Sequence, residues 1–176
     1  VIEVFGPVVA NFTSDETQGI APLTVNFSDT STGTISSWSW DFGDGSTSTL
    51  ADPSHQYTTP GIYSVSLTVS GDGGTDSEIK TDYITVYAPV TANFTASTTS
   101  GPAPLKVTFT DTSTGDFDTY FWDFGDVSTS TLADPNHQYT TPGVYTVTLT
   151  VNGDGGTDSE IKTDFITVEN ENNSNF

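Results

Sequence analysis

The chain has 176 residues and no Cys, which allows one medium domain or two small ones and excludes a disulfide framework, a thiol nucleophile and a thiolate metal site. Three Lys, no Arg and 23 acidic residues give a formal net charge of −20. This balance excludes nucleic acid as a partner, because a phosphate backbone requires a basic patch. We also expect no direct membrane insertion, since no apolar run approaches the roughly 20 residues needed to span a bilayer.

Residues 1–7 and the end of the chain both look like seams between repeats. Residues 2–8 align with residues 84–90, so we expect residues 1–7 to be the tail of a preceding repeat. Residues 170–176 are polar and end in Asn-Phe, and we expect a linker into a next repeat. The alternative is that the first residues form a detached strand, donated to the sheet edge of a neighbouring subunit. Repetition favours the tandem array.

The sequence repeats itself at a fixed offset. Phe12 and Phe94 occupy the same Asn-Phe-Thr triplet, 82 residues apart, and the match continues without a gap to the end of the second copy. A period of this length is that of a whole small domain, so two complete modules follow each other. The sequence predicts the first module over residues 8–87 and the second over residues 88–169.

Alternation of apolar with polar residues predicts strands that each have one buried face. In chain order, the first module shows it over residues 23–28, 38–42 and 63–70, and the last of these runs has its copy at residues 145–152. No segment has sustained helical periodicity. We therefore expect an all-β fold of two tandem immunoglobulin-like sandwiches, each with about seven short strands.

Gly and Pro mark the connections between these strands. Pro60-Gly61 and its copy suit the two central positions of a type II turn, in which Gly accepts a positive φ. Residues 71–74 and their copy read as the tips of hairpins. The last strand changes phase between Ile79 and Ile84, which predicts a β-bulge there.

The sequence closely resembles the polycystic kidney disease (PKD) domain family in an ordered set of motifs. In the first module the motifs are Trp40-Asp41-Phe42-Gly43-Asp44-Gly45, Asp52-Pro53, His55-Gln56-Tyr57 and Pro60-Gly61-Ile62-Tyr63. The second module repeats the signature as Trp122, Asp123, Phe124, Gly125 and Asp126, with Val127 in place of the last Gly. The resemblance implies a seven-strand sandwich of an extracellular or cell-surface protein, as in the multi-copy PKD regions of archaeal and bacterial surface proteins.

The signature carboxylates Asp41 and Asp44 could be mistaken for an acidic active site. A glycosidase would also need a cleft and one carboxyl group with a raised pKa, and nothing in the sequence marks a cleft. The turn chemistry of Asp and Gly favours a structural role. His55 and His137 occur once per module, so they cannot assemble a multi-His metal site within one domain. We interpret the chain as non-enzymatic, with no cofactor required.

Calcium is the functional alternative for the acidic residues. Carboxylates are suitable ligands for it, and the resemblance implies it because some family members in bacterial collagenases bind calcium. The candidate pairs are Asp41 with Asp44, Asp72 with Asp76, and Asp154 with Asp158. The competing interpretation is that these are solvated carboxylates of turns and hairpins.

Four Asn residues satisfy the Asn-x-Ser/Thr pattern for N-linked glycans. They are Asn11, Asn26, Asn93 and Asn172. Strand alternation sends the first three outward, because the Phe that follows each of them belongs in the core. The alternative is an unmodified polar strand face.

Phe121 stands at an outward strand position where the first module has Ser39, and it is a candidate contact residue. Our leading hypothesis is a structural module of an extracellular filament, stalk or surface layer, with neighbouring copies, adjacent repeats or a surface polysaccharide as partners. The alternatives are a carbohydrate- or protein-binding accessory module of a secreted hydrolase and a calcium-dependent adhesin.

Overall fold

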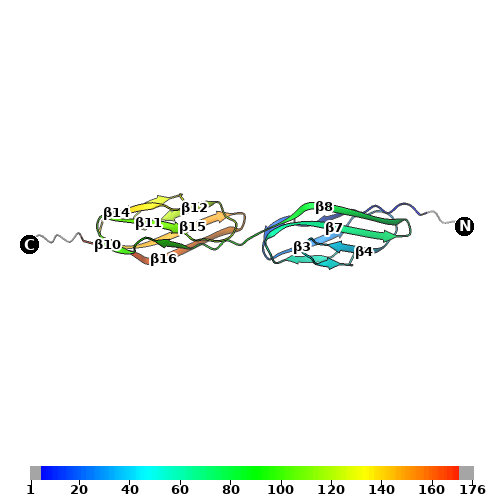
Figure 1. Ribbon diagram of the computed structural model, residues 1–176, viewed down its shortest axis with the longest axis horizontal. Helices are drawn as coiled ribbons and strands as arrows, with labels where there is room; N and C mark the ends of the chain where they lie inside the picture. Colours follow the sequence, from blue (N-terminus) through cyan, green and yellow to red (C-terminus); the bar gives the residue numbers. More distant parts are fainter. Residues whose placement is uncertain (1–4, 171–176) are drawn as a thin grey trace, which may run out of the picture. The chain divides into compact units, whose positions relative to one another are not determined.

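The computed structural model describes residues 5–170, and within that range its regular secondary structure consists of β-strands alone. The chain divides into two compact units, the first ending at Ala88 and the second beginning at Pro89. Each unit contains its own pair of sheets (Figure 1). The all-β fold with two sandwiches is therefore confirmed.

The first unit contains eight strands. They are β1 (Phe12–Ser14), β2 (Gln18–Ile20), β3 (Leu23–Asp29), β4 (Ile35–Asp41), β5 (Thr47–Ser48), β6 (Ser54–Tyr57), β7 (Gly61–Gly71) and β8 (Gly74–Tyr87). One sheet has the order β1-β3-β6, and the other has the order β2-β8-β7-β4-β5. All pairs are antiparallel except β2 with β8. The expected seven strands are counted as eight because the first strand crosses from one sheet to the other after Ser14.

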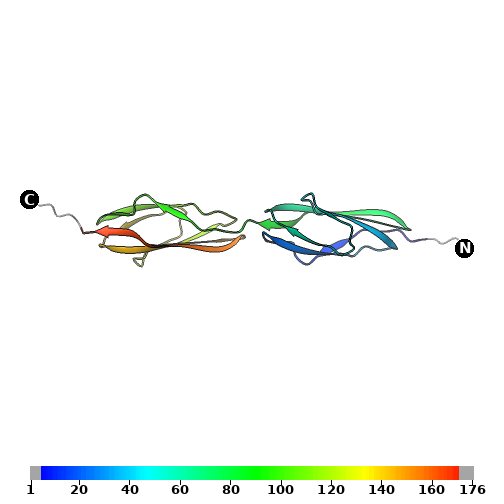
Figure 2. The same ribbon diagram turned by 90° about the horizontal axis from the view of Figure 1, so that it is seen from below.

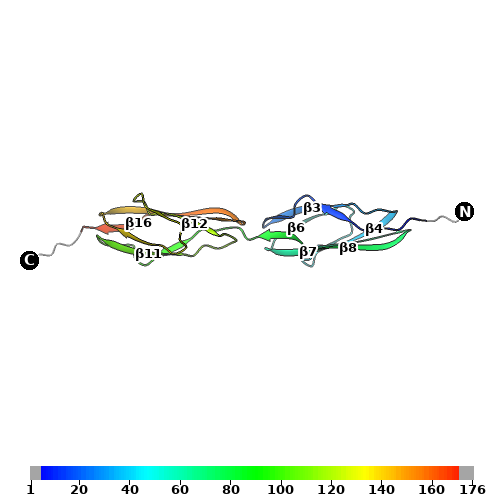
Figure 3. The same ribbon diagram turned by 90° about the horizontal axis from the view of Figure 1, so that it is seen from above.

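The second unit repeats this arrangement with the same pairing. Its strands are β9 (Phe94–Ala96), β10 (Ser100–Pro102), β11 (Leu105–Asp111), β12 (Thr119–Asp123), β13 (Thr129–Ser130), β14 (Asn136–Tyr139), β15 (Gly143–Gly153) and β16 (Gly156–Glu169). The sheet orders are β14-β11-β9 and β10-β16-β15-β12-β13. Figures 2 and 3 show the two sheets of each unit as two layers.

Aromatic side chains from both sheets meet in the core of each unit. In the first unit, Trp40 of β4 is fully buried, and the ring of Phe12 from the opposite sheet lies 5.1 Å from it. Phe27 of β3 packs 5.3 Å from Phe42. The second unit has the same set around Trp122. Side chains at alternate positions thus fill the interior from both layers, as the sequence pattern predicts.

The β-bulge expected between Ile79 and Ile84 is present. Tyr63 pairs with Ile84 but Val65 pairs with Lys80, so β8 contains two more residues than β7 across this step. Asp82 lies in the bulge with a φ of 51°, and its backbone N–H donates a hydrogen bond to Ser64 Oγ at 3.0 Å. The bulge restores the inward direction of Ile84.

The prediction of a type II turn at Pro60-Gly61 is wrong. Gly61 is the first residue of β7, pairs with Val86, and is not among the residues of positive φ. The corner is held instead by Tyr63, whose hydroxyl donates to the carbonyl oxygen of Thr59 at 2.7 Å. The hairpin at residues 71–74 is confirmed, with Gly71 pairing with Gly74.

Candidate functional sites

The Trp-Asp-Phe-Gly-Asp segment forms the end of β4 and the turn that follows it. Trp40 and Phe42 point into the core, whereas Asp41 and Asp44 lie on the exposed side. The indole N–H of Trp40 donates to the carbonyl oxygen of Leu50 at 2.8 Å, so the one polar group of this ring is satisfied. The Trp therefore connects the core to the loop before β6.

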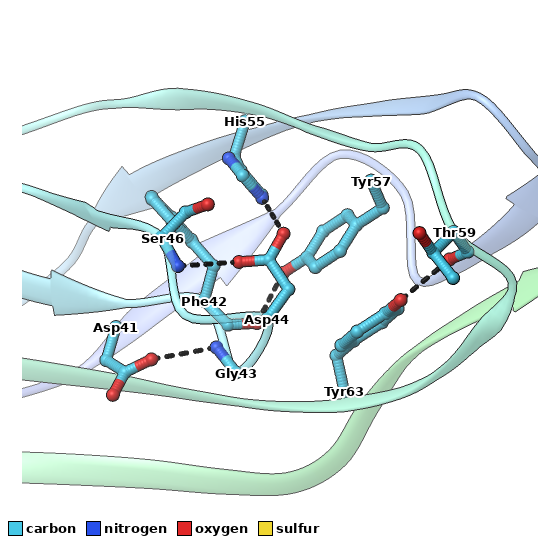
Figure 4. Close-up of polar contacts among 9 residues, drawn as sticks. All are labelled: Asp41, Phe42, Gly43, Asp44, Ser46, His55, Tyr57, Thr59 and Tyr63. Atoms are coloured by element: carbon cyan, nitrogen blue, oxygen red, sulfur yellow. Dashed lines mark hydrogen bonds and ion pairs between the residues drawn. The ribbon is translucent and has the colours of Figure 1, made fainter.

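Both carboxylates of the signature hold their own turn (Figure 4). Asp41 Oδ1 accepts the backbone N–H of Gly43 at 2.9 Å, and Asp44 Oδ1 accepts that of Ser46 at 2.9 Å. Gly43 has a φ of 81°, and a Cβ atom there would lie 2.4 Å from the carbonyl oxygen of Ser64. This position therefore requires Gly, and the carboxylates stabilise the turn that it makes.

His55 of β6 completes the cluster shown in Figure 4. Its Nε2 lies 2.8 Å from Asp44 Oδ2. Its ring is stacked on Phe42, with centroids 4.3 Å apart, and meets Tyr57 edge to face. The buried hydroxyl of Tyr57 donates to the carbonyl oxygen of Phe42 at 3.0 Å. The His therefore joins the turn after β4 to the edge of the other sheet.

Hydrogen bonding and burial shift two pKa values in this cluster in opposite directions. Partial burial alone would raise the pKa of Asp44, but the Ser46 backbone N–H and the His55 imidazole stabilise the carboxylate and lower its pKa. Burial, followed by the nearby charge of Asp44, raises the pKa of the Tyr57 phenol. Asp44 thus favours its charged form and Tyr57 its neutral form, as structural hydrogen bonding requires.

The second unit contains the same cluster. His137 Nε2 lies 2.8 Å from Asp126 Oδ2, and its ring stacks on Phe124 at 4.3 Å. Asp123 Oδ1 accepts the backbone N–H of Gly125 at 2.8 Å. Val127 stands where the first unit has a Gly of positive φ, and it keeps a φ of 70° with its side chain fully exposed. The turn survives this replacement because no neighbouring atom opposes the side chain.

The residues of the two candidate calcium pairs in the hairpins have different surroundings. Asp72 and Asp154 lie at hairpin tips, while Asp76 and Asp158 each accept a backbone N–H, from Ala10 and Ala92 respectively, at 2.8 Å. Within residues 5–170, no group of three or more His, Cys, Asp or Glu side chains is arranged to hold a metal ion. Asp76 and Asp158 thus bind backbone N–H groups rather than the other residue of their pair, and calcium binding stays a prediction.

The edge strand β1 is capped by side chains, a feature that the sequence analysis missed. The two outward backbone groups of Phe12 are both satisfied: its N–H donates to Asn11 Oδ1 at 2.9 Å, and its carbonyl oxygen accepts from Lys80 Nζ at 2.5 Å. The Lys80 ammonium also lies 4.7 Å from the centre of the Phe12 ring. Together with Asp76 on Ala10, these side chains occupy the place where another strand would pair.

The same edge cap is built on β9. Asn93 Oδ1 accepts the backbone N–H of Phe94 at 2.8 Å, and Lys162 Nζ donates to the Phe94 carbonyl oxygen at 2.7 Å. Lys162 also lies over the rings of Phe94 and Phe165. Two of the three Lys residues of a strongly acidic chain are therefore packed, partly buried, against an edge strand.

The candidate glycosylation residues fall into two environments. Asn11 and Asn93 are exposed and precede the edge strands β1 and β9, whereas Asn26 is exposed on the central strand β3. Asn172 lies outside the described residues. Phe121 is half exposed on β12, opposite Thr150, and its role as a contact residue stays a prediction.

The surface of the second unit also contains a pocket. A shallow pocket on β11 and β14 is lined by Lys106, Asn136, His137 and Gln138. It contains no nucleophile next to a base, and its His is already engaged with Asp126. The described part of the chain has no helix that could cross a membrane.

Comparison with models of known protein families shows which family the chain belongs to. The family model described as PKD domain matches residues 6–86 and again residues 87–168. The chain belongs to the PKD domain family. Its two units are thus two PKD domains in tandem, and the signature residues around Trp40 and Trp122 are those that fold the turn after β4 and β12.

Curated relatives contain similar PKD domains within much longer proteins. The pre-pro-metalloprotease PrtV of Vibrio cholerae is 47% identical over 60 residues, which are 34% of this chain and 6% of the relative. Collagenase ColA of Bacillus cereus is 50% identical over 44 residues, which are 25% of this chain and 5% of the relative. The chain thus corresponds to a small part of these proteins, and the similarity covers PKD sequence.

A solved structure of the four N-terminal Ig domains of Dscam1 isoform 6.9 covers 96% of this chain and 48% of its own, with a TM-score of 0.54 at 12% identity. At this identity the likeness concerns the fold alone. It agrees with an immunoglobulin-like sandwich for each PKD domain.

Proposed function

We propose that this chain is a non-catalytic structural part of an extracellular protein, in which tandem PKD domains build a filament, stalk or surface layer. The observation that carries the proposal is the duplication of a complete, self-contained sandwich. Each unit has its own aromatic core, its own His–Asp cluster and its own edge cap. Units that fold without help from one another can be repeated along a chain without changing their interior.

The polar groups of each unit support a structural role. The signature carboxylates, the His and the buried Tyr all have structural partners, which leaves none of them in the arrangement that acid–base chemistry needs. The net charge of −20 suits a hydrated outer surface. Under this proposal the partners are neighbouring copies or adjacent repeats of the same chain.

The edge caps bear on how copies could join. Strand addition requires outward backbone N–H and C=O groups that are open to a new strand. At β1 and β9 the outward groups of Phe12 and Phe94 are taken by Asn and Lys side chains. A strand donated by a neighbouring subunit would therefore have to pair with a different sheet edge. Repeats that are joined covalently along one chain need no free sheet edge.

Electron microscopy of the native surface material tests this proposal. Periodic fibres or a regular layer labelled by an antibody against the chain would support it. Discrete particles that each carry a folded catalytic domain would overturn it in favour of the second candidate.

The second candidate is an accessory module of a secreted hydrolase that binds protein or carbohydrate. It is favoured by the PKD domains of the metalloprotease PrtV and of collagenase ColA. Co-sedimentation of the two-domain protein with insoluble collagen or with polysaccharide tests it, and recovery of all protein in the supernatant would count against it. A calcium-dependent adhesin would instead show a melting temperature that falls when calcium is chelated.

A further inference from the structure

Asn11 and Asn93 take part in the edge caps through the oxygen of the side-chain amide only. Asn11 Oδ1 accepts the N–H of Phe12 at 2.9 Å, and Asn93 Oδ1 accepts that of Phe94 at 2.8 Å. The amide nitrogen of each, Nδ2, has no hydrogen-bond partner within the described part of the chain, and both residues are exposed. The hydrogen bond to Oδ1 thus holds the side chain in one orientation and leaves Nδ2 without a hydrogen bond among the described residues.

Asn26 is held differently. It belongs to β3, which is paired on both sides, and its Nδ2 donates to Asp15 Oδ2 at 2.6 Å. Its backbone N–H donates to the other oxygen of the same carboxylate at 2.8 Å. The second unit has Thr108 at this place, so only the sequons at Asn11 and Asn93 occur in both domains.

We propose that Asn11 and Asn93 carry N-linked glycans in the mature protein and that Asn26 does not. The inference rests on the extracellular location in the proposed function, because the transfer requires a polyprenyl-phosphate-linked oligosaccharide donor. In the transfer, Nδ2 forms a bond to C1 of the sugar and loses one proton, while the C1–O bond to the phosphate breaks and the phosphate keeps the electron pair. Oδ1 is not consumed, so the hydrogen bond to the following N–H survives modification.

A glycan on these residues would lie along the outward side of β1 and β9. Those strands already lack open backbone groups at Phe12 and Phe94. The sugar adds bulk and hydration at the same edges, which opposes pairing between neighbouring copies. At Asn26 a glycan would have to share Nδ2 with the Asp15 carboxylate.

Peptide mass spectrometry of protein isolated from its source organism tests the assignment. Trypsin leaves Asn11 and Asn26 in one fragment, because the first Lys of the chain is Lys80. Cleavage after Glu16 and Glu78 places the three sequons in three different peptides. We expect glycan mass on the peptides of Asn11 and Asn93 and the bare peptide mass for Asn26. A bare Asn11 or Asn93 peptide, or a modified Asn26 peptide, would overturn the proposal.

Matched variants expressed in the same organism separate the sequon from the cap. Thr13→Ala removes the first sequon but keeps Asn11 and its hydrogen bond, so the intact mass should fall by one glycan. Ser28→Ala removes the Asn26 sequon and should change the mass only by the substitution itself. Filaments built from unmodified protein would refute the glycan assignment and leave the proposed function standing. Dispersed protein with glycans on both Asn11 and Asn93 would support the glycan assignment and refute the proposed function.

Discussion

The imidazole of His55 lies parallel to the ring of Phe42, with the planes inclined by 2° and the centroids 4.3 Å apart. The same imidazole is bound to Asp44 at 2.8 Å. The His55 side chain thus joins the edge strand β6 to the turn after β4. In the second domain, His137 joins β14 to the turn after β12 in the same way.

Replacing His55 by Ala should destabilise the first domain. The change removes the ring stacking and the partner of the Asp44 carboxylate, and we expect a loss of about 1–3 kcal/mol in the free energy of unfolding. Urea unfolding of the two-domain protein measures it. Only the transition of the first domain should move, and His137→Ala should move only the other; equal movement of both transitions after either change would contradict independent domains.

The lowered pKa of Asp44 makes the stability of the first domain depend on acid. Its folded-state pKa lies below the ordinary value of 3.8, so its contribution is fully present above pH 3.8 and is lost as pH falls through the folded pKa. Asp44→Asn should therefore be less stable than wild type at pH 7, and the difference should shrink below pH 3.8. Thermal unfolding of both proteins at pH 7 and pH 3 measures this. A difference that grows on acidification would contradict the assignment.

The two Gly residues of the signature turn should respond differently to substitution. Gly43 and Gly45 both have positive φ, but a Cβ at Gly43 would lie 2.4 Å from a backbone oxygen, while Gly45 has nothing within 4 Å. Gly43→Ala should cost more than about 2 kcal/mol, from strain as well as conformation. Gly45→Val should cost about 1 kcal/mol or less, because Val127 occupies that position in the second domain. Chemical denaturation compares them, and equal costs would refute the role of the close contact.

Removal of the Lys80 cap should weaken the edge strand. Lys80→Met keeps the aliphatic stem but leaves the Phe12 carbonyl oxygen without its donor and removes the cation over the ring, so we expect a loss of about 1–3 kcal/mol. Lys106→Met is the matched control, because it changes the net charge equally and its ammonium has no hydrogen-bond or ion-pair partner within residues 5–170. We expect the control to stay within about 0.5 kcal/mol of wild type. Sedimentation of both variants would also show whether the uncapped edge associates.

The sequence alone determined the two-domain repeat, the all-β class, the buried positions and the bulge before Ile84. These features are local, since a period of two residues along one strand already separates the inward side chains from the outward ones. The motif around Trp40 identified the family for the same reason, because its residues are adjacent in the chain and act in one turn.

Only the tertiary structure decided which polar groups meet. Lys80 and Phe12 are 68 residues apart, and Asp76 and Ala10 are 66 apart, so the edge cap exists only after β8 is folded against β1. The turn expected at Pro60-Gly61 failed for a related reason: pairing of Gly61 with Val86 extends the backbone there, whatever the local preference of the dipeptide. Contacts between distant segments are set by how the two sheets pack, and the sequence pattern carries no information about that geometry until the strands are placed.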